Sequence, residues 1–188
     1  MSVAAAAWVC WAAAWLVLSR GVKPAVRHES HLSRALHLVP LFAGGLLLAQ
    51  QRGLGWLEAP VVQRAAWMAP TGAALTAAGL IFAVWARLVL GGNWSGTVTV
   101  KRDHELIRTG PYALARHPIY TGMLTGLVGT ALAIDAWRAV LAFAIVTLSF
   151  LRKLRTEEAF MRAEFGASYD AYRAEVPALV PRPWRRMK

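Results

Sequence analysis

Five long apolar stretches alternate with polar segments along the chain, and their lengths indicate helices that cross a membrane. The stretches cover residues 2–18, about 35–50, about 67–90, about 119–134 and 136–151. A helix needs about 20 apolar residues to cross the hydrocarbon core, so several of these helices must extend into their polar flanks, or the bilayer must thin locally. Little more than Asp135 separates the last two stretches, which are therefore expected to form a short antiparallel hairpin.

Composition favours a membrane protein over a soluble domain with a large core. Apolar residues make up 57% of the 188 residues and charged residues 16%, against about half and about a quarter in soluble domains. The first stretch has no basic segment before it and no clear cleavage site, so we expect a retained helix. The single cysteine, Cys10, lies in an apolar run, and no metal site is expected. We predict an all-α, polytopic membrane protein with about five transmembrane helices and one domain over 1–188.

Basic residues are distributed unevenly between the two sides of this topology. With the N-terminus outside, 17 of the 21 Lys and Arg residues fall in 19–34, 91–118 and the tail from 152, and three fall on the opposite side. Because positive residues collect on the cytoplasmic side, the C-terminus is predicted to be cytoplasmic. Anionic lipid headgroups account for the net charge of +11, so we expect the lipid bilayer and no nucleic acid as a partner. The Ala- and Arg-rich composition suggests a bacterial inner membrane.

Polar chemistry is concentrated in residues 104–122, "HELIRTGPYALARHPIYTG". Pro111 and Pro118 prevent a regular helix through this segment and leave backbone amides and carbonyls unpaired. Irregular backbone at membrane depth is tolerated only where it is buried in protein or lines a polar cavity. Upstream, "TVTV" at 97–100 reads as a short extended piece. We therefore predict a cytoplasmic pocket built from the 91–120 loop.

The C-terminal tail is predicted to supply the other half of that pocket. It should continue the last apolar helix beyond the membrane, with Gly166 as a weak point and Pro177 beyond its end. Met161, Phe165, Tyr169 and Tyr172 form an apolar stripe at helical spacing, which could lie on the membrane surface or against the core. The histidines His28, His31 and His37 match no metal-site spacing and are interpreted as loop and interface residues.

The order of these motifs resembles the isoprenylcysteine carboxyl methyltransferase family and, more distantly, membrane phospholipid N-methyltransferases. The resemblance rests on H-x-L-x-x-x-G-P-Y-x-x-x-R-H-P-x-Y-x-G, a hydrophobic hairpin, R-x-E-E, and F-G-x-x-Y-x-x-Y before a Pro-rich end, over about residues 91–183. It implies methyl transfer from S-adenosyl-L-methionine, with S-adenosyl-L-homocysteine as product, at the cytoplasmic membrane face. On this reading 1–66 holds two N-terminal spans and 67–188 is the catalytic core.

The resemblance also implies roles for individual residues. His117, Arg155 and Glu158 are expected to be catalytic, and Asn93, Trp94 and Arg155 to bind the methyl acceptor. Lys153 competes with Arg155, and Glu157 with Glu158, for the position that faces the site. The residues expected to bind the cofactor are Thr97, His104, Glu105, Leu106, Ile107, Tyr112, His117, Pro118, Ile119, Tyr120, Glu157 and Glu158.

Several acceptors and functions remain open at this point. A carboxylate is already a nucleophile and could be held by an arginine through a two-pronged hydrogen bond, and it is the acceptor we expect most. An amine acceptor would have to lose a proton, and His117 or a glutamate could then act as the base. A lipid thiol is a third acceptor. The alternatives to a lipid or prenyl carboxylate methyltransferase are a phospholipid amine N-methyltransferase, a nicotinamide-dependent membrane reductase of the sterol-reductase-like type, and a non-catalytic membrane protein.

Overall fold

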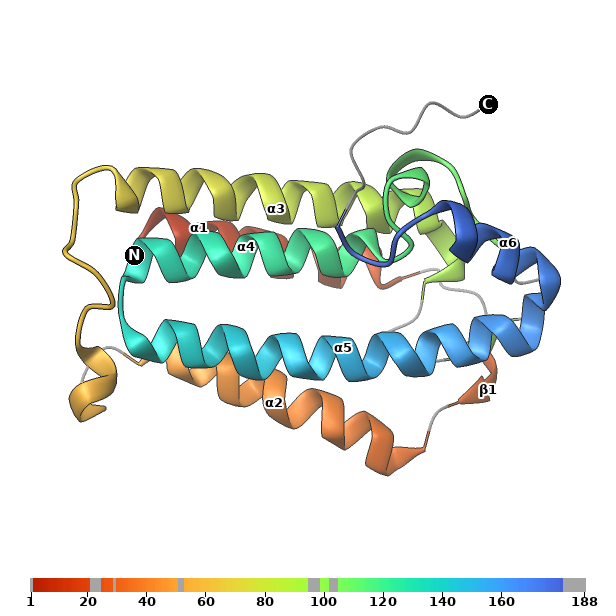
Figure 1. Ribbon diagram of the computed structural model, residues 1–188, viewed down its shortest axis with the longest axis horizontal. Helices are drawn as coiled ribbons and strands as arrows, with labels where there is room; N and C mark the ends of the chain where they lie inside the picture. Colours follow the sequence, from red (N-terminus) through yellow and green to blue (C-terminus); the bar gives the residue numbers. More distant parts are fainter. Residues whose placement is uncertain are drawn as a thin grey trace.

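Helices account for almost all of the structure, a computed structural model that describes residues 2–20, 25–28, 30–50, 53–94, 99–101 and 105–180. Five long helices run side by side along the length of the molecule, and a short sixth helix lies at one end (Figure 1). Their bounds are α1 Val3–Leu18, α2 His31–Ala49, α3 Met68–Leu90, α4 Pro118–Ile134, α5 Trp137–Phe165 and α6 Ala167–Glu175. All five predicted apolar helices are therefore present, and α5 continues into the tail as expected.

Local sequence signals explain where these helices begin and end. Ser2 and Ser30 cap α1 and α2 by accepting backbone N–H groups, and the cap at Ser30 makes α2 start at His31 rather than near residue 35. Asp135 adopts the left-handed conformation (φ 48°) between α4 and α5, which makes the sharp hairpin turn. Gly166 has φ 51° and divides α5 from α6, at the weak point that the sequence predicted.

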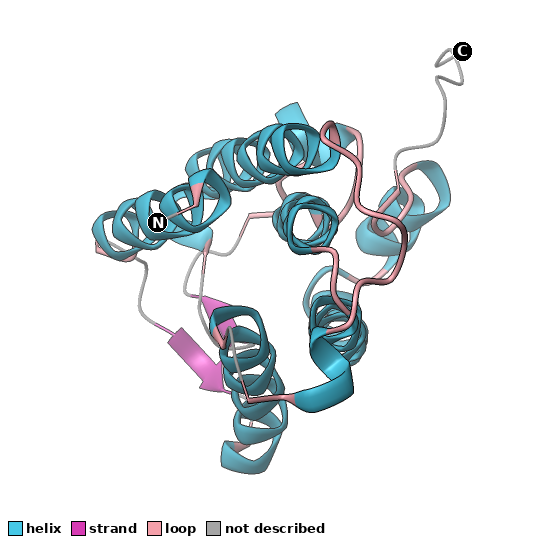
Figure 2. Ribbon diagram, turned by 90° about the vertical axis from the view of Figure 1, so that its left-hand side faces the viewer, coloured by secondary structure: helices cyan, strands magenta, loops and turns pink. Residues whose placement is uncertain are grey.

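α4 runs between α3 and α5, α2 packs along α5, and α1 packs on α3 (Figures 1 and 2). Glycines let α3 and α4 approach until their backbones touch: a Cβ added at Gly79 would lie 2.5 Å from the carbonyl oxygen of Gly122. The core beside this pair is formed by Leu127, Val146 and Phe150. These packings hold the first turn of α4 in a defined place at one end of the bundle.

Segments that are far apart in the sequence meet at each end of the bundle. At one end a short antiparallel pair of strands, β1 Ala25–His28 and β2 Thr99–Lys101, joins the loop after α1 to the loop after α3. At the other end the turn around Asp135 meets the segment before α3, because Val61 and Val62 donate their N–H groups to the Asp135 carboxylate. The strand pair modifies the predicted all-α class, and β2 confirms an extended piece within "TVTV".

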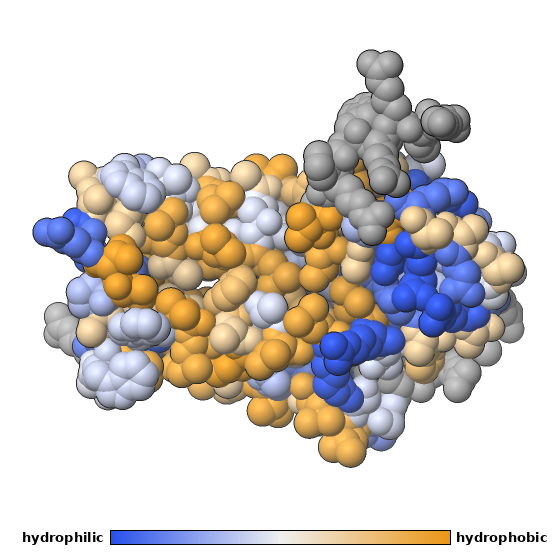
Figure 3. All heavy atoms as spheres, in the orientation of Figure 1, coloured by the Kyte–Doolittle hydropathy of each residue, from blue (hydrophilic) through white to orange (hydrophobic). Residues whose placement is uncertain are grey.

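The surface is divided into an apolar body and a polar end. On the face in Figure 3, hydrophobic residues cover the long helices, and hydrophilic residues gather at the end that carries α6. Two described segments, α2 and Met68–Asn93, are long and apolar enough to cross a membrane, and α1 and α4 are apolar but shorter. This arrangement supports a membrane protein, whereas the number of five spans stays a prediction.

Candidate active site

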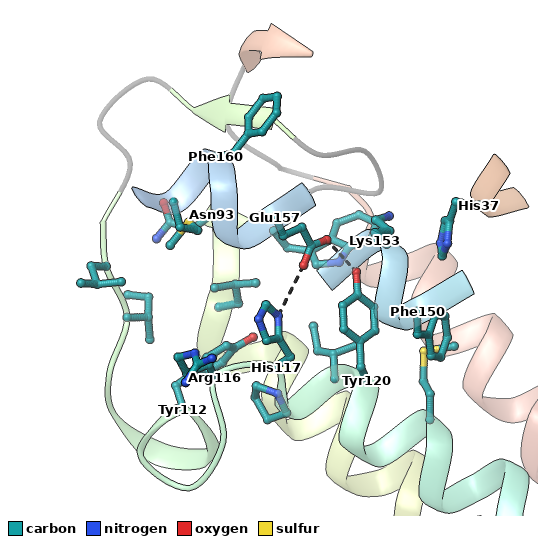
Figure 4. Close-up of a pocket in the computed structure, with 18 of the residues that line it drawn as sticks. His37, Asn93, Tyr112, Arg116, His117, Tyr120, Phe150, Lys153, Glu157 and Phe160 are labelled. Atoms are coloured by element: carbon teal, nitrogen blue, oxygen red, sulfur yellow. Dashed lines mark hydrogen bonds and ion pairs between the residues drawn. The ribbon is translucent and has the colours of Figure 1, made fainter. Parts of the chain in front are cut away.

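A cavity of about 340 Å³ opens at the polar end of the bundle, within the size range of small-molecule sites. Its walls come from all six helices and from the segment between β2 and α4. Figure 4 shows the side chains around its polar centre, where His117, Tyr120, Glu157 and Lys153 lie close together. The lining residues are Trp11, Trp15, His37, Leu38, Leu41, Leu90, Asn93, Trp94, Glu105, Leu106, Ile107, Tyr112, Arg116, His117, Pro118, Ile119, Tyr120, Met123, Phe150, Lys153, Glu157, Phe160, Met161, Tyr169 and Tyr172.

The segment before α4 crosses the cavity mouth in irregular backbone, as its prolines require. Gly110 has φ 60° and opens a 3-10 turn, Gly110–Ala113, that buries Tyr112. The carbonyl of Tyr112 accepts a hydrogen bond of 2.6 Å from the Tyr172 hydroxyl. Pro118 stands in the first turn of α4, where its missing N–H costs nothing. The loop and α6 thus close one side of the cavity together.

Glu158 is the centre of a cluster of charges behind this wall. Its Oε1 accepts a hydrogen bond of 3.0 Å from Nε of Arg116 and lies 3.3 Å from Nε2 of His117. Its Oε2 lies 3.4 Å from Nε of Arg173. The Arg116 side chain also donates to the carbonyls of Arg173 and Val176. Glu158 therefore ties α5 to the loop and to α6, and it does not line the cavity.

Glu157 faces the cavity and is held from α4. Its Oε1 accepts a 2.6 Å hydrogen bond from the Tyr120 hydroxyl, and its Oε2 lies 3.5 Å from Nδ1 of His117 (Figure 4). The rings of His117 and Tyr120 are stacked at 5.8 Å, and Tyr120 stacks on Phe150 at 4.9 Å. Side chains at the start of α4 therefore hold the Glu157 carboxylate in a fixed orientation toward the cavity.

The two glutamates and His117 stabilise each other's charged forms. Burial alone would lower the pKa of His117, but hydrogen bonds and charges from Glu157 and Glu158 outweigh it and raise that pKa. Burial opposes ionisation of both acids as well, yet the bond to His117 lowers the pKa of Glu157. Bonds to His117 and Arg116 lower the pKa of Glu158 to about 2. The cluster therefore favours the ionised form of both carboxylates and the protonated form of His117.

The segment after α6 is hydrogen-bonded to the start of α4. The N–H groups of Arg116 and His117 donate to the carbonyls of Pro177 and Ala178, at 2.8 and 3.0 Å. The Thr121 hydroxyl donates to the carbonyl of Leu179 at 2.7 Å. The loop and the tail that were predicted to share one pocket are thus bound to each other directly, at the same end of the bundle.

The remaining polar lining comes from α5 and from the end of α3. Lys153 is buried, with 5% of its surface exposed, one turn before Glu157 on the same face of α5. Asn93 has a buried side-chain oxygen without a hydrogen-bond partner among the described residues. Trp94 packs under the guanidinium of Arg87, whose Cζ lies 4.5 Å from the ring centroid. Arg87 is buried and donates to the carbonyls of Leu18 and Gly91.

The structure brings most of the residues predicted from the sequence to one cavity. Thr97 and His104 lie outside the described residues. Arg155 is exposed and does not line the cavity, because it projects from a different face of α5 than Lys153 does. Glu158 is turned toward Arg116 and Arg173 instead of the cavity. The predicted residues that line it are Asn93, Trp94, Glu105, Leu106, Ile107, Tyr112, His117, Pro118, Ile119, Tyr120 and Glu157.

The sequence reasoning missed the walls that α1, α2 and α6 supply. His37, interpreted as a loop or interface histidine, is buried beside Phe150, with Nδ1 2.9 Å from the Ser149 hydroxyl, and lines the cavity. Tyr169 and Tyr172 are buried, so the apolar stripe faces the core rather than the membrane surface. Trp11 and Trp15 stand four residues apart on one face of α1, a spacing that could have marked them as a wall.

Comparison with known proteins identifies the same region of the chain. The model of the isoprenylcysteine carboxyl methyltransferase (ICMT) family matches residues 72–163. The protein-S-isoprenylcysteine O-methyltransferase of Schizosaccharomyces pombe is 37% identical over 94 residues, which are 48% of this chain and 40% of the relative. Protein-S-isoprenylcysteine O-methyltransferase B of Arabidopsis thaliana is 30% identical over 118 residues, which are 61% of this chain and 60% of the relative. The chain spans about half the length of these curated relatives.

A solved structure shares the fold. It is described as the eukaryotic intramembrane Ras methyltransferase ICMT without a monobody, and it matches with a TM-score of 0.55 and 22% sequence identity. The match covers 81% of this chain and 54% of the solved chain, so the likeness extends beyond the segment matched by the family model. Residues 72–163 are thus similar to the isoprenylcysteine carboxyl methyltransferase family, and the chain shares the fold of the solved methyltransferase.

Proposed function

We propose that this membrane protein transfers a methyl group from S-adenosyl-L-methionine to the carboxylate of a lipid-like acceptor at the cytoplasmic membrane face. The observation that carries the proposal is the composition of the cavity at the polar end of the bundle. Glu157, His117 and Lys153 surround its polar centre, and Trp11, Leu41 and other apolar side chains line its extension between the helices. Such a cavity suits a water-soluble donor at one end and an apolar chain at the other.

The lining residues fit the cofactor. The Glu157 carboxylate would pair with the ammonium group or the ribose hydroxyls. When bound, S-adenosyl-L-methionine supplies an activated methyl group whose transfer to a carboxylate requires no proton to be removed. The task left to the protein is to position the two reactants.

His117 favours a carboxylate acceptor over an amine. An amine must lose its proton to a base, but His117 lies between two carboxylates that raise its pKa and favour its protonated form. Glu157 and Glu158 are engaged with His117, Tyr120 and Arg116, which lowers the pKa of both acids and makes them weak bases. The buried ammonium group of Lys153 at the cavity wall would hold an anionic acceptor by charge.

Titration calorimetry of the purified protein with S-adenosyl-L-homocysteine tests the cofactor. We expect micromolar binding, and we expect Glu157→Gln to weaken it about tenfold or more, because a charge-assisted hydrogen bond is lost. Glu164→Gln is the matched control, since Glu164 is an exposed glutamate on the same helix that does not line the cavity. Binding of a reduced nicotinamide dinucleotide in place of the homocysteine derivative would overturn the proposal in favour of a reductase.

Label transfer tests the acceptor chemistry. Membranes with and without the protein are supplied with methyl-labelled cofactor, and the labelled lipid is treated with mild alkali. A methyl ester releases its label as methanol, whereas an N-methyl group retains it. Retained label would support an amine or a thiol acceptor, and no protein-dependent label would support a non-catalytic role.

A further inference from the structure

His117 lies between two carboxylates that have different surroundings. Its Nδ1 is 3.5 Å from Oε2 of Glu157, which lines the cavity, and its Nε2 is 3.3 Å from Oε1 of Glu158, which does not. A neutral imidazole carries one N–H donor, whereas an imidazolium carries two. Only the protonated ring can therefore donate to both glutamates at once, so the second proton of His117 links the cavity to the buried cluster behind it.

Glu158 depends little on that second proton. Nε of Arg116 donates to its Oε1 at 3.0 Å, and Nε of Arg173 lies 3.4 Å from its Oε2. A neutral His117 ring that keeps its proton on Nε2 would still donate to Glu158. The buried cluster would therefore stay intact if His117 lost the proton on Nδ1.

Glu157 is the acid that a positive group in the cavity would meet. Its Oε1 accepts from the Tyr120 hydroxyl, and its Oε2 faces Nδ1 of His117 (Figure 4). A cation that pairs with Glu157 from the cavity would share this carboxylate with the imidazolium, and the two positive charges would repel each other at short range. Lys153, buried one turn before Glu157, adds a further positive charge that acts on the same carboxylate.

His117 is the cation in this cluster that gives up a proton most easily. The ordinary pKa is about 6.5 for histidine, about 10.4 for lysine and above about 12 for arginine. Glu157 and Glu158 raise the pKa of His117, and part of that effect is lost when another cation shares Glu157. Among the described residues, the other titratable or charged groups that face this cluster or line the cavity are His37, Glu105, Tyr112, Arg116, Tyr120, Lys153, Tyr169 and Arg173. Of these types only histidine ordinarily titrates between about pH 5 and about pH 9.

We propose that His117 loses a proton when the ammonium group of the cofactor pairs with Glu157, so that cofactor binding and deprotonation of His117 are linked. The Nδ1–H bond breaks, its electron pair stays on Nδ1, and the proton passes to water or buffer. The bare Nδ1 still faces Glu157, so this exchange belongs to cofactor binding and supplies no base to the acceptor. Cofactor affinity then rises with pH. The inference rests on the proposed function, since it takes this cavity as the cofactor site.

Titration calorimetry in buffers of different ionisation enthalpy counts the released protons. The ligand is S-adenosyl-L-homocysteine, from about pH 5.5 to about pH 9, with the titration of its own amine subtracted. We expect release of up to one proton per ligand, and an affinity that rises by at most about tenfold per pH unit between the pKa values of His117 with and without ligand. S-adenosyl-L-methionine carries one more positive charge and should release at least as much. Proton uptake, no exchange at any pH, or a smaller release with S-adenosyl-L-methionine would overturn the inference.

Nitrogen-15 NMR of histidine-labelled protein assigns the proton to an atom. Without ligand, both ring nitrogens of His117 should show the shifts of protonated nitrogen at about pH 6. With ligand near neutral pH, Nδ1 should move to the shift of an unprotonated nitrogen, and Nε2 should keep its proton. A ring that stays doubly protonated at every pH where protons are released, or one that loses the proton from Nε2, would contradict the proposed link.

Substitution of histidines tests the source of the proton independently. His117→Gln should release no proton and should bind the ligand with an affinity that no longer rises with pH, even where the affinity itself is lower. His31→Gln is the matched control, because His31 is an exposed histidine on α2 that does not line the cavity, and it should release as much as the wild type. Release that persists in His117→Gln would assign the proton to another group, such as His37, and would overturn the inference. If His117→Gln does not fold, the NMR of the wild-type protein decides.

The outcomes separate this inference from the proposed function. Failure of both S-adenosyl ligands to bind would overturn the methyltransferase proposal and the link together. Binding without proton exchange would retain the methyltransferase proposal and remove only the link between His117 and the cofactor.

Discussion

The two interfaces of α4 are built in opposite ways. Toward α3, glycines bring the two backbones into contact, and a Cβ at Gly72 would lie 2.5 Å from the carbonyl of Gly129. α4 and α5 are joined by the hairpin turn at Asp135 and pack on each other through Leu127 and Val146. At the far end from that turn, side chains around the cavity, such as Tyr120 and Glu157, link the two helices. The first interface should respond to added volume, and the second to lost charge. The difference explains how one helix can be placed rigidly and still border a polar cavity.

Adding volume between α3 and α4 should have the largest effect. In Gly79→Val the new Cβ would meet the backbone of Gly122 at 2.5 Å, and backbone atoms of two packed helices cannot move aside easily. We expect a loss of at least about 3 kcal/mol in the free energy of unfolding. Thermal unfolding in detergent measures it. Gly45→Val on α2 is the control, since nothing lies within 4 Å of its Cβ, and an equal loss there would contradict the comparison.

Removing charge between α4 and α5 should have the second largest effect on the free energy of unfolding. Glu158→Ala leaves the Arg116 guanidinium buried, with 9% of its side chain exposed, beside an empty position. Breaking a buried ion pair in this way costs about 3–5 kcal/mol in well-buried cases, and we expect the lower end here because carbonyls still hold Arg116.

Glu157→Gln sharpens the same test, because Glu157 faces the cavity and bonds to neither arginine. Glu157→Gln should keep the unfolding temperature within a few degrees while losing cofactor affinity. The reverse pattern, with Glu158→Ala stable and Glu157→Gln unfolded, would exchange the roles assigned to the two acids.

The helix ends were largely open to prediction from the sequence. Apolar stretches, Asp135, Gly166 and the prolines are local signals, and they placed the helices to within a few residues, whereas the cap at Ser30 was missed. The motifs also assembled most of the polar cavity lining, since the loop and α5 each carry their residues close together in the chain.

Contacts between distant segments could not be predicted in the same way. Which face of α5 turns inward depends on where α4 and α2 pack, so Lys153 could not be told from Arg155, nor Glu157 from Glu158. His37 reaches the cavity only because α2 lies along α5, and no pattern near His37 records that packing. The burial of Tyr169 and Tyr172 likewise depends on the turn at Gly166.

Stability measured against pH should show the contribution of the charged groups between α4 and α5, because the glycine contacts between α3 and α4 do not titrate. The pKa of His117 is raised above 6.5, so its stabilising effect is complete below pH 6.5 and is lost as the pH rises through the raised value. The pKa of Glu158 falls from 4.5 to about 2, so its effect is present above pH 4.5 and is lost as the pH falls toward 2.

We therefore expect greatest stability from about pH 4.5 to above pH 6.5. Denaturant unfolding across this range measures it, and carbon-13 NMR of labelled histidine should place the pKa of His117 above 6.5. In Glu158→Gln the acid-side loss should diminish. A pKa of His117 below 6.5 would show that burial outweighs the two carboxylates.

The smallest effect is expected on the outer face of α5. Arg155→Met removes a charge that is exposed and lines no part of the cavity, so methyl transfer and stability should stay within about twofold and about 0.5 kcal/mol. Lys153→Met is the matched variant, because it keeps an unbranched chain and removes the buried ammonium group. If Lys153 holds the acceptor carboxylate, this variant should raise KM for the acceptor about tenfold or more while cofactor affinity changes little. A larger effect in Arg155→Met than in Lys153→Met would mean that Arg155, and not Lys153, holds the acceptor.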